Sequence, residues 1–224
     1  MTSPLFRFLR SLAFVLGKVL GLVLSLAAPL APARALVGAE PDARFADRVA
    51  MVLIRGGDKA GFCTGLVLGP RILLTAAHCL RPLHDMAVHY RDGAGEPVII
   101  PVDAAIADGG PPPIGARAIV TGFGAAREGD WPSGGTLRSV TLAVREPAST
   151  VLVWAADPAG RAAGACSGDS GAPIWSADGT RAIAIVAWAQ APQPRPCGGL
   201  TQGPLLAPLK GWIEETERKL KEGG

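Results

Sequence analysis

The chain has 224 residues, 49% of them hydrophobic and 18% charged, and a formal net charge of +3. Four of its 22 basic residues and none of its 19 acidic residues lie in the first 35 positions, so the remainder is close to neutral, with 18 basic against 19 acidic side chains. Such a balance gives no basis for nucleic-acid binding. The remaining stretch of about 189 residues suffices for one large or two small domains.

Residues 1–35 have the pattern of a secretory signal peptide. Basic side chains accompany an apolar stretch from Val19 to Ala28, and Ala33-Arg34-Ala35 has the form of an A-x-A cleavage site. Lys18 interrupts the apolar run and leaves it too short for a transmembrane anchor, and no cysteine near the cleavage site offers a point for lipid attachment. We therefore expect a secreted or periplasmic protein with no stable membrane anchor.

Short β-like runs separated by glycine and proline recur along the rest of the chain. The expected strands are Met51–Ile54, Phe62–Leu68, Arg71–Thr75, Met86–Tyr90, Val98–Val102, Ala118–Phe123, Leu137–Val144, Val151–Trp154, Pro173–Trp175 and Ala182–Trp188. The 29 glycines and 20 prolines leave little room for long helices. This pattern predicts an all-β barrel or sandwich.

The chain divides at a proline-rich segment and ends in a helical pattern. Residues 109–113 read Gly-Gly-Pro-Pro-Pro, which cannot lie inside a sheet and is expected to connect two halves, 36–110 and 111–208. Residues 209–224 are expected to form a helix packed by one face. That face would carry four apolar side chains at roughly helical spacing: Leu209, Trp212, Ile213 and Leu220.

Two short motifs carry the groups needed for nucleophilic acyl transfer. Thr75–Cys79 places His78 just after an apolar strand, and Cys166–Pro173 places Ser170 among glycines that let backbone N–H groups approach its hydroxyl. A serine needs a base within hydrogen-bond reach to act as a nucleophile, and backbone amides can stabilise the oxyanion. The α/β-hydrolase elbow does not fit, because it needs glycine two positions after the serine, where this chain has Ala172.

Both motifs resemble the signatures of the trypsin-like (chymotrypsin-fold) serine proteases, in that family's order of histidine before serine. The resemblance implies two antiparallel β-barrels, the first of them shortened in this chain, followed by a C-terminal α-helix. It also implies an exported endopeptidase that hydrolyses protein or peptide substrates through an acyl-enzyme, without a cofactor or metal. Oligomeric state is not indicated.

The resemblance assigns roles to individual residues. His78 would be the general base, Ser170 the nucleophile, and the N–H groups of Gly168 and Ser170 the oxyanion hole. Four cysteines in an exported chain read as two disulfides, which could pair in three ways. The resemblance selects Cys63–Cys79 and Cys166–Cys197.

The resemblance also implies an ion pair at the mature N-terminus. Residues 36–39 read Leu-Val-Gly-Ala and are similar to the activated N-terminus of the family, in which the ammonium pairs with the aspartate before the serine. We expect signal peptidase to free Leu36, whose ammonium would then approach Asp169. Arg34 permits the alternative that a trypsin-like cut starts the mature chain at Ala35.

The specificity pocket is expected to be apolar. The family's pocket floor lies six residues before the nucleophile, at Gly164 here, followed by Ala165. The wall would be Ala187, Trp188 and Ala189. Without a carboxylate on the floor, a preference for small or medium apolar side chains is expected rather than one for Lys or Arg.

The third member of the triad is ambiguous in the sequence. One alignment takes Asp85, within His84–Val88, as the acid, only seven positions after His78. The other treats Met86–Tyr90 and Val98–Val102 as a hairpin, so that Asp103 or no residue fills the role. An alternative function follows from the second alignment, that of a catalytically impaired pseudoprotease acting as a binding protein.

Overall fold

The computed structural model describes residues 36–56, 59–69, 71–90, 105–191 and 197–223. The chain divides into two compact units, Met1–Pro32 and Ala33–Gly224, and the described residues belong to the second. The expected signal peptide, the expected strand Val98–Val102 and the candidate acid Asp103 lie outside the described residues.

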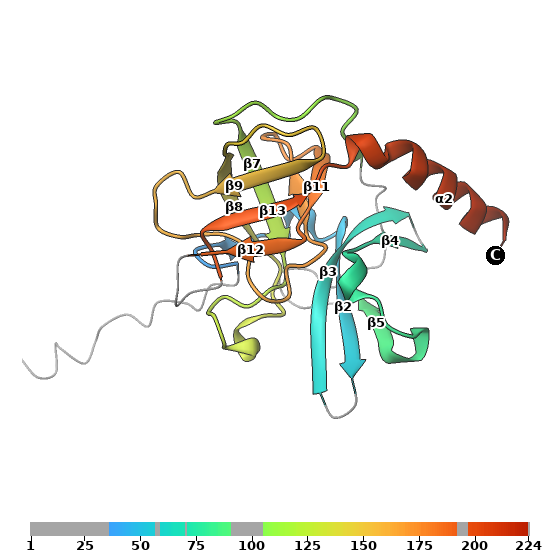
Figure 1. Ribbon diagram of the computed structural model, residues 1–224. Coiled ribbons are helices and arrows are strands. Elements are labelled where there is room, and N and C mark those ends of the chain that lie inside the picture. The colour runs from blue at the N-terminus through green and yellow to red at the C-terminus, as the bar shows by residue number, and fades with distance from the viewer. Residues whose placement is uncertain (1–35, 57–58, 70, 91–104, 192–196, 224) are drawn as a thin grey trace, which may run out of the picture. The chain divides into compact units, whose positions relative to one another are not determined.

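The smaller of two sheets carries the histidine motif. Its strands are β2 (Val49–Gly56), β3 (Lys59–Gly69), β4 (Ile72–Leu74) and β5 (Met86–His89), in the antiparallel order β4-β3-β2-β5 (Figure 1). The hairpin β2–β3 is in register from Val49↔Leu66 to Gly56↔Lys59. Its buried side chains include β-branched and other apolar residues, which suit a pleated surface covered on one face.

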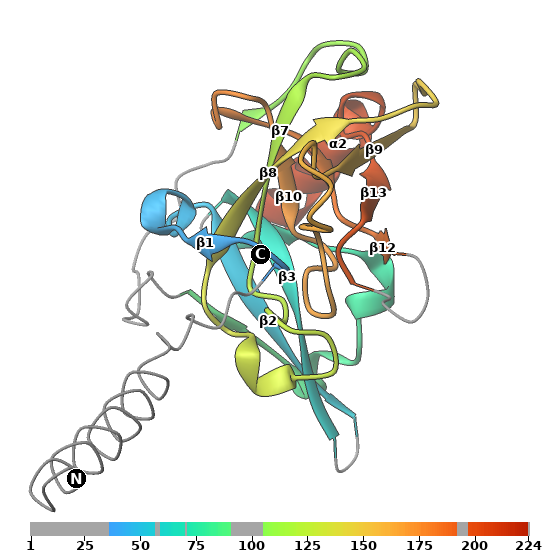
Figure 2. The ribbon, with the colours of Figure 1, turned by 90° about the vertical axis from the view of Figure 1, so that its left-hand side faces the viewer.

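The larger sheet has nine strands and carries the serine motif. Their order is β12-β13-β9-β8-β7-β10-β11-β6, and β1 pairs with β8 (Figure 2). In chain order they are β1 (Glu40–Pro41), β6 (Ala105–Ile106), β7 (Arg117–Gly122), β8 (Arg138–Val144), β9 (Leu152–Ala156), β10 (Pro173–Trp175), β11 (Arg181–Ile185), β12 (Trp188–Gln190) and β13 (Leu200–Pro204). The described pairings are antiparallel except β6 with β11, which is parallel.

Two details of the larger sheet differ from the sequence prediction. The single strand expected at Ala182–Trp188 is two strands, β11 and β12. Between them, the backbone of Val186 exchanges hydrogen bonds with Gly171 and Ala172, beside the serine. The short strands β1 and β6 precede position 110, yet both pair with the larger sheet.

An aromatic cluster joins the two sheets. Phe45 stacks on Trp175 of β10 with ring centroids 5.2 Å apart, and the guanidinium of Arg48 lies 5.1 Å from both ring centroids. The same core contains Leu66 of β3 and Phe123, which follows β7, and both are fully buried. Burial of this apolar surface fixes the histidine-bearing sheet against the serine-bearing sheet.

The C-terminal helix α2 spans Lys210–Glu222, so the helix prediction is confirmed (Figure 1). Its expected packing is wrong in part: Ile213 is buried, whereas Trp212 and Leu220 are 62% and 58% exposed. Side-chain pairs at helical spacing, such as Lys219 with Glu215 at 3.1 Å, stabilise the exposed turns instead.

The predicted fold class is confirmed by this arrangement of two largely antiparallel sheets and one C-terminal helix. In the part of the chain that the structure describes, no helix is long and apolar enough to span a membrane.

Candidate active site

The structure brings the two sequence motifs together. His78 lies in a short 3₁₀ helix, Ala77–Cys79, directly after β4, and its Nε2 atom is 2.7 Å from Oγ of Ser170. This is the distance expected between a nucleophile and its general base. A disulfide from Cys79 to Cys63 of β3 ties the histidine turn to the neighbouring strand.

The loop before the serine presents two backbone amides. Gly168 has a φ of +97°, and a Cβ atom there would lie 2.4 Å from Cε2 of Phe62. Only glycine adopts this conformation freely in so narrow a space. Among the described residues, the N–H groups of Gly168 and Ser170 donate to no recorded acceptor, so both are available to a substrate oxygen.

Thr64 of β3 links the smaller sheet to the serine loop, a role that sequence analysis did not identify. Its hydroxyl donates to the carbonyl of Gly168 at 2.9 Å and accepts from the N–H of Phe123 at 3.1 Å. Its own N–H donates to the carbonyl of Ser170 at 2.9 Å. Thr64 is fully buried in a strand and belongs to no recognisable sequence motif. Only the tertiary structure therefore reveals its role.

Replacing Thr64 with valine is expected to destabilise the protein, because the carbonyl of Gly168 and the N–H of Phe123 would lose their buried partner. The expected decrease in the free energy of unfolding is about 1–3 kcal/mol. Urea denaturation measures it, with Thr141→Val on β8 as the matched control, since Thr141 has no recorded side-chain hydrogen bond in the described structure. Equal losses in the two variants would contradict this role for Thr64.

Asp169 is fully buried behind the oxyanion loop. Its carboxylate accepts hydrogen bonds from the N–H groups of Gly124 at 2.8 Å and Cys166 at 2.9 Å. Burial raises the pKa of Asp169 to about 7, although these two bonds and the nearby charge of Arg138 act in the opposite direction. No recorded bond joins Asp169 to the ring of His78, so it does not stand where a triad acid would.

Leu36 is buried at the start of the described chain. Its side chain packs in the core of the larger sheet, and the next residue, Val37, accepts a hydrogen bond from the N–H of Gly164 at 3.0 Å. Within the described residues no hydrogen bond joins Leu36 to Asp169. The nitrogen of Leu36 is here part of a peptide bond and carries no charge.

Asp85 is not brought to His78. It ends the 3₁₀ helix Leu83–Asp85, and its carboxylate lies 3.4 Å from Nε2 of His84. The strand that follows, β5, pairs with β2, which is the arrangement expected from the alignment that makes Met86–Tyr90 a hairpin strand. Across the described ranges, no carboxylate makes a hydrogen bond to the His78 ring.

At the expected floor of the specificity pocket, the backbone of Gly164 packs closely against Thr201. A Cβ atom on Gly164 would lie 2.9 Å from Oγ1 of Thr201, and that hydroxyl also accepts from the N–H of Ala165 at 3.0 Å. On the expected wall, Trp188 is 62% exposed on β12, Ala187 is exposed and Ala189 is half-buried. The second disulfide, Cys166–Cys197, connects this region to the serine loop.

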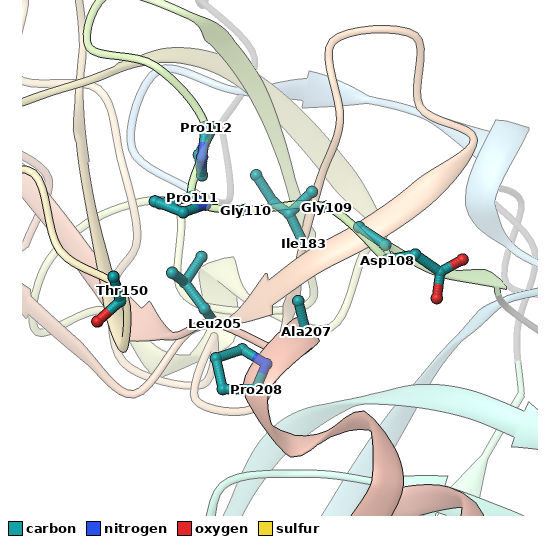
Figure 3. Close-up of a pocket in the computed structure, with 11 residues that line it drawn as sticks. Asp108, Gly109, Gly110, Pro111, Pro112, Thr150, Ile183, Leu205, Ala207 and Pro208 are labelled. Carbon is teal, nitrogen blue, oxygen red and sulfur yellow. The ribbon is translucent and has the colours of Figure 1, made fainter.

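A separate hollow of about 310 Å³ lies beside the start of α2 (Figure 3). Ile183, Leu205 and Pro208 give it an apolar lining, and Asp108 at its rim forms an ion pair with Lys210. Neither His78 nor Ser170 lines it, so it is not part of the candidate active site.

Comparisons with known proteins agree with this geometry. Residues 37–103 match the family model described as Trypsin. No curated protein matches the chain in sequence.

Solved structures with the same fold include a serine protease, a heparin binding protein and an inactivated protease paralogue. Mouse neuropsin, a serine protease expressed in the limbic system of the brain, has a TM-score of 0.60 at 16% identity, covering 80% of this chain and 98% of its own. A mutant of human heparin binding protein has a TM-score of 0.62 at 15% identity, with coverages of 81% and 96%. An inactivated protease paralogue of the scabies mite has a TM-score of 0.61 at 18% identity, with coverages of 80% and 99%.

At these identities the structural likeness concerns the fold alone. The sequence match covers residues 37–103, a segment that contains His78. The chain therefore has the chymotrypsin-like fold, and residues 37–103 are similar in sequence to the trypsin family.

Proposed function

We propose that this protein is an exported serine endopeptidase that cleaves peptide bonds through an acyl-enzyme. The observation that carries the proposal is the 2.7 Å contact between Nε2 of His78 and Oγ of Ser170, formed across 92 residues of sequence. The histidine comes from the half 36–110 and the serine from the half 111–208, so the site joins the two halves.

Each step of the reaction has a group in position to perform it. Oγ of Ser170 attacks the peptide carbonyl carbon while His78 takes its proton, and the N–H groups of Gly168 and Ser170 stabilise the oxyanion. The C–N bond then breaks as His78 gives the proton to the leaving amine. Water, deprotonated by His78, attacks the remaining ester and releases the acid and the serine.

The substrate residue before the cleaved bond is expected to be small or medium and apolar, because residues 164 and 165 are glycine and alanine. A peptide library read by mass spectrometry tests both the activity and this preference, with Ser170→Ala as the inactive control. Cleavage after Arg would refute the assignment of the pocket. Cleavage that persists in Ser170→Ala would refute the assignment of the nucleophile.

A second candidate function, that of a pseudoprotease binding protein, is favoured by one observation. No described carboxylate orients the ring of His78. Disabling the aspartate of such a triad costs about 10⁴ in turnover, while substrate binding and the oxyanion hole remain. A folded protein that binds peptides and leaves them uncleaved would support this alternative.

Asp85→Asn is expected to leave kcat/KM for peptide hydrolysis essentially unchanged, because the Asp85 carboxylate meets His84 rather than His78. The parallel variant Asp103→Asn tests the other candidate acid. Steady-state kinetics distinguish them, since loss of a true triad aspartate lowers turnover by about 10⁴. A loss of that size in Asp85→Asn would make Asp85 the acid after all.

Processing between Ala35 and Leu36 is proposed as the maturation step. Leu36 has a φ of +49°, a left-handed conformation that costs a non-glycine residue about 1–2 kcal/mol. Cutting this bond removes that restraint and creates an ammonium, which we expect to insert toward the buried Asp169. Their ion pair would raise the amine pKa above about 7.7–8.0, so its stabilisation is full below that range and lost as the pH rises through the raised pKa.

N-terminal sequencing of the exported protein tests this maturation step. The expected first residue is Leu36. Any other start, including Ala35 after a trypsin-like cut, would exclude it.

A further inference from the structure

The Asp169 carboxylate occupies the place where Gly122 lacks a side chain. A Cβ atom built on Gly122 of β7 would lie 2.2 Å from Oδ1 of Asp169. Gly124, two residues later, approaches the same carboxylate and donates its N–H at 2.8 Å. The end of β7 is therefore shaped to receive this one buried acid.

Arg138 begins β8 and stands directly opposite Gly122 in the β7–β8 pairing. Side chains of directly paired residues project from the same face of a sheet, with Cβ atoms about 4.5–5.5 Å apart. Arg138 therefore projects from the face on which Asp169 lies, at a distance that a long side chain spans. It is 7% exposed, unusual burial for an arginine.

Few described charges act on Arg138 and Asp169. The guanidinium of Arg138 is attracted by two carboxylates, Asp169 from the serine loop and Glu40 from β1. The same attraction lowers the pKa of Asp169, although burial of the carboxyl group raises it by more. The positive charge persists at neutral pH, because an arginine stays protonated in proteins. Asp169 thus faces a cation in the uncleaved chain, before any N-terminal ammonium exists.

We propose that Arg138 is a positioning residue that supplies a resident counter-charge for Asp169 and so holds the oxyanion loop in place before the N-terminus is freed. An ionised Asp169 accepts stronger hydrogen bonds from Gly124 and Cys166 than a neutral one. Those bonds anchor the loop from which Gly168 and Ser170 present their N–H groups. Ser170 of the uncleaved chain is then already able to react, so that chain is not an inactive precursor. This inference rests on the proposed protease function.

The test compares two forms of the protein: the full chain kept intact by Ala35→Leu, since a large residue blocks A-x-A processing, and the chain processed to Leu36. The rate at which a fluorophosphonate labels Ser170 is measured in each. Arg138→Gln is expected to slow labelling of the intact chain at pH 7 by about fivefold, because raising the pKa of Asp169 by about one unit from about 7 lowers its ionised fraction from about one half to about one tenth. The processed chain should be slowed less, because the Leu36 ammonium compensates.

Matched variants separate a charge effect from loss of packing. Arg117→Gln removes an exposed arginine from the neighbouring strand β7 and should change neither rate. Arg138→Lys should restore labelling of the intact chain at pH 7, and the defect of Arg138→Gln should shrink as the pH rises to about 9, where Asp169 is ionised without a counter-charge. Equal effects of Arg138→Gln on both forms would overturn the proposal.

A measurement that needs no catalysis keeps this inference distinct from the proposed function. Carbon-13 NMR of the Asp169 carboxyl in the intact chain should show its pKa raised by about one unit or more in Arg138→Gln, and largely restored in Arg138→Lys. An unchanged pKa would overturn the role of Arg138. Failure of the wild-type processed chain to label at all would instead contradict the proposed function. If Arg138→Gln does not fold, Arg138→Met takes its place, and an unchanged Asp169 pKa in that variant would overturn the proposal.

Discussion

Replacing His78 with alanine should reduce the rate of peptide hydrolysis by about 10⁶, the loss seen when the base of such a triad is removed. The physical reason is the 2.7 Å contact between Nε2 of His78 and Oγ of Ser170. Without the imidazole, no described group stands ready to take the serine proton. Steady-state kinetics on a peptide cleaved by the wild type measure the loss, and the effect should lie in kcat.

A second histidine offers a matched control for this substitution. His84 is also exposed, lies in a neighbouring 3₁₀ helix and contacts Asp85 rather than the serine. His84→Ala should therefore retain the wild-type rate. Comparable losses in the two variants would show that removal of an imidazole disturbs this face of the protein generally, and that His78 has no special role.

Gly171→Ala should be the most destabilising of the glycine substitutions at the site. Its φ is +83°, and a new Cβ atom would lie 2.2 Å from the carbonyl oxygen of Thr64 and 2.9 Å from the N atom of Ala76. Both are backbone atoms, so the histidine-bearing sheet must move away from the serine loop. We expect the free energy of unfolding to fall by about 3 kcal/mol or more, from backbone strain and overpacking together.

Gly115 supplies a control for the cost of placing alanine in a backbone conformation with positive φ. It has the same φ of +83° but no atom within 4 Å of a new Cβ. Gly115→Ala should therefore lose only about 1–2 kcal/mol. Urea denaturation of both variants gives the difference, and equal midpoints would contradict the close approach between the two loops at Gly171.

The sequence predicts the chemistry of the site well because the demands are local. An oxyanion loop needs glycine at 168 for a positive φ, and the serine must follow it within two positions. The strands of the β2–β3 hairpin can also be predicted from the sequence, because apolar runs bounded by glycines are typical of half-buried strands.

Other features depend on residues that meet only after folding. Thr64 and Arg138 look like ordinary strand residues, and their roles come from partners more than 30 positions away. The strand β13, Leu200–Pro204, contains both glycine and proline and therefore resembles a loop in the sequence. Asp85 matches the family's acid in local sequence, but the pairing of β5 with β2 directs the chain elsewhere.

The central claim is that Ser170 is a nucleophile activated by His78. Reaction of the processed protein with a fluorophosphonate, followed by peptide mapping with mass spectrometry, tests it most directly. The account predicts one adduct per chain, located on Ser170, absent in Ser170→Ala and strongly slowed in His78→Ala. A correctly folded protein with both disulfides formed that acquires no adduct on Ser170 would contradict it.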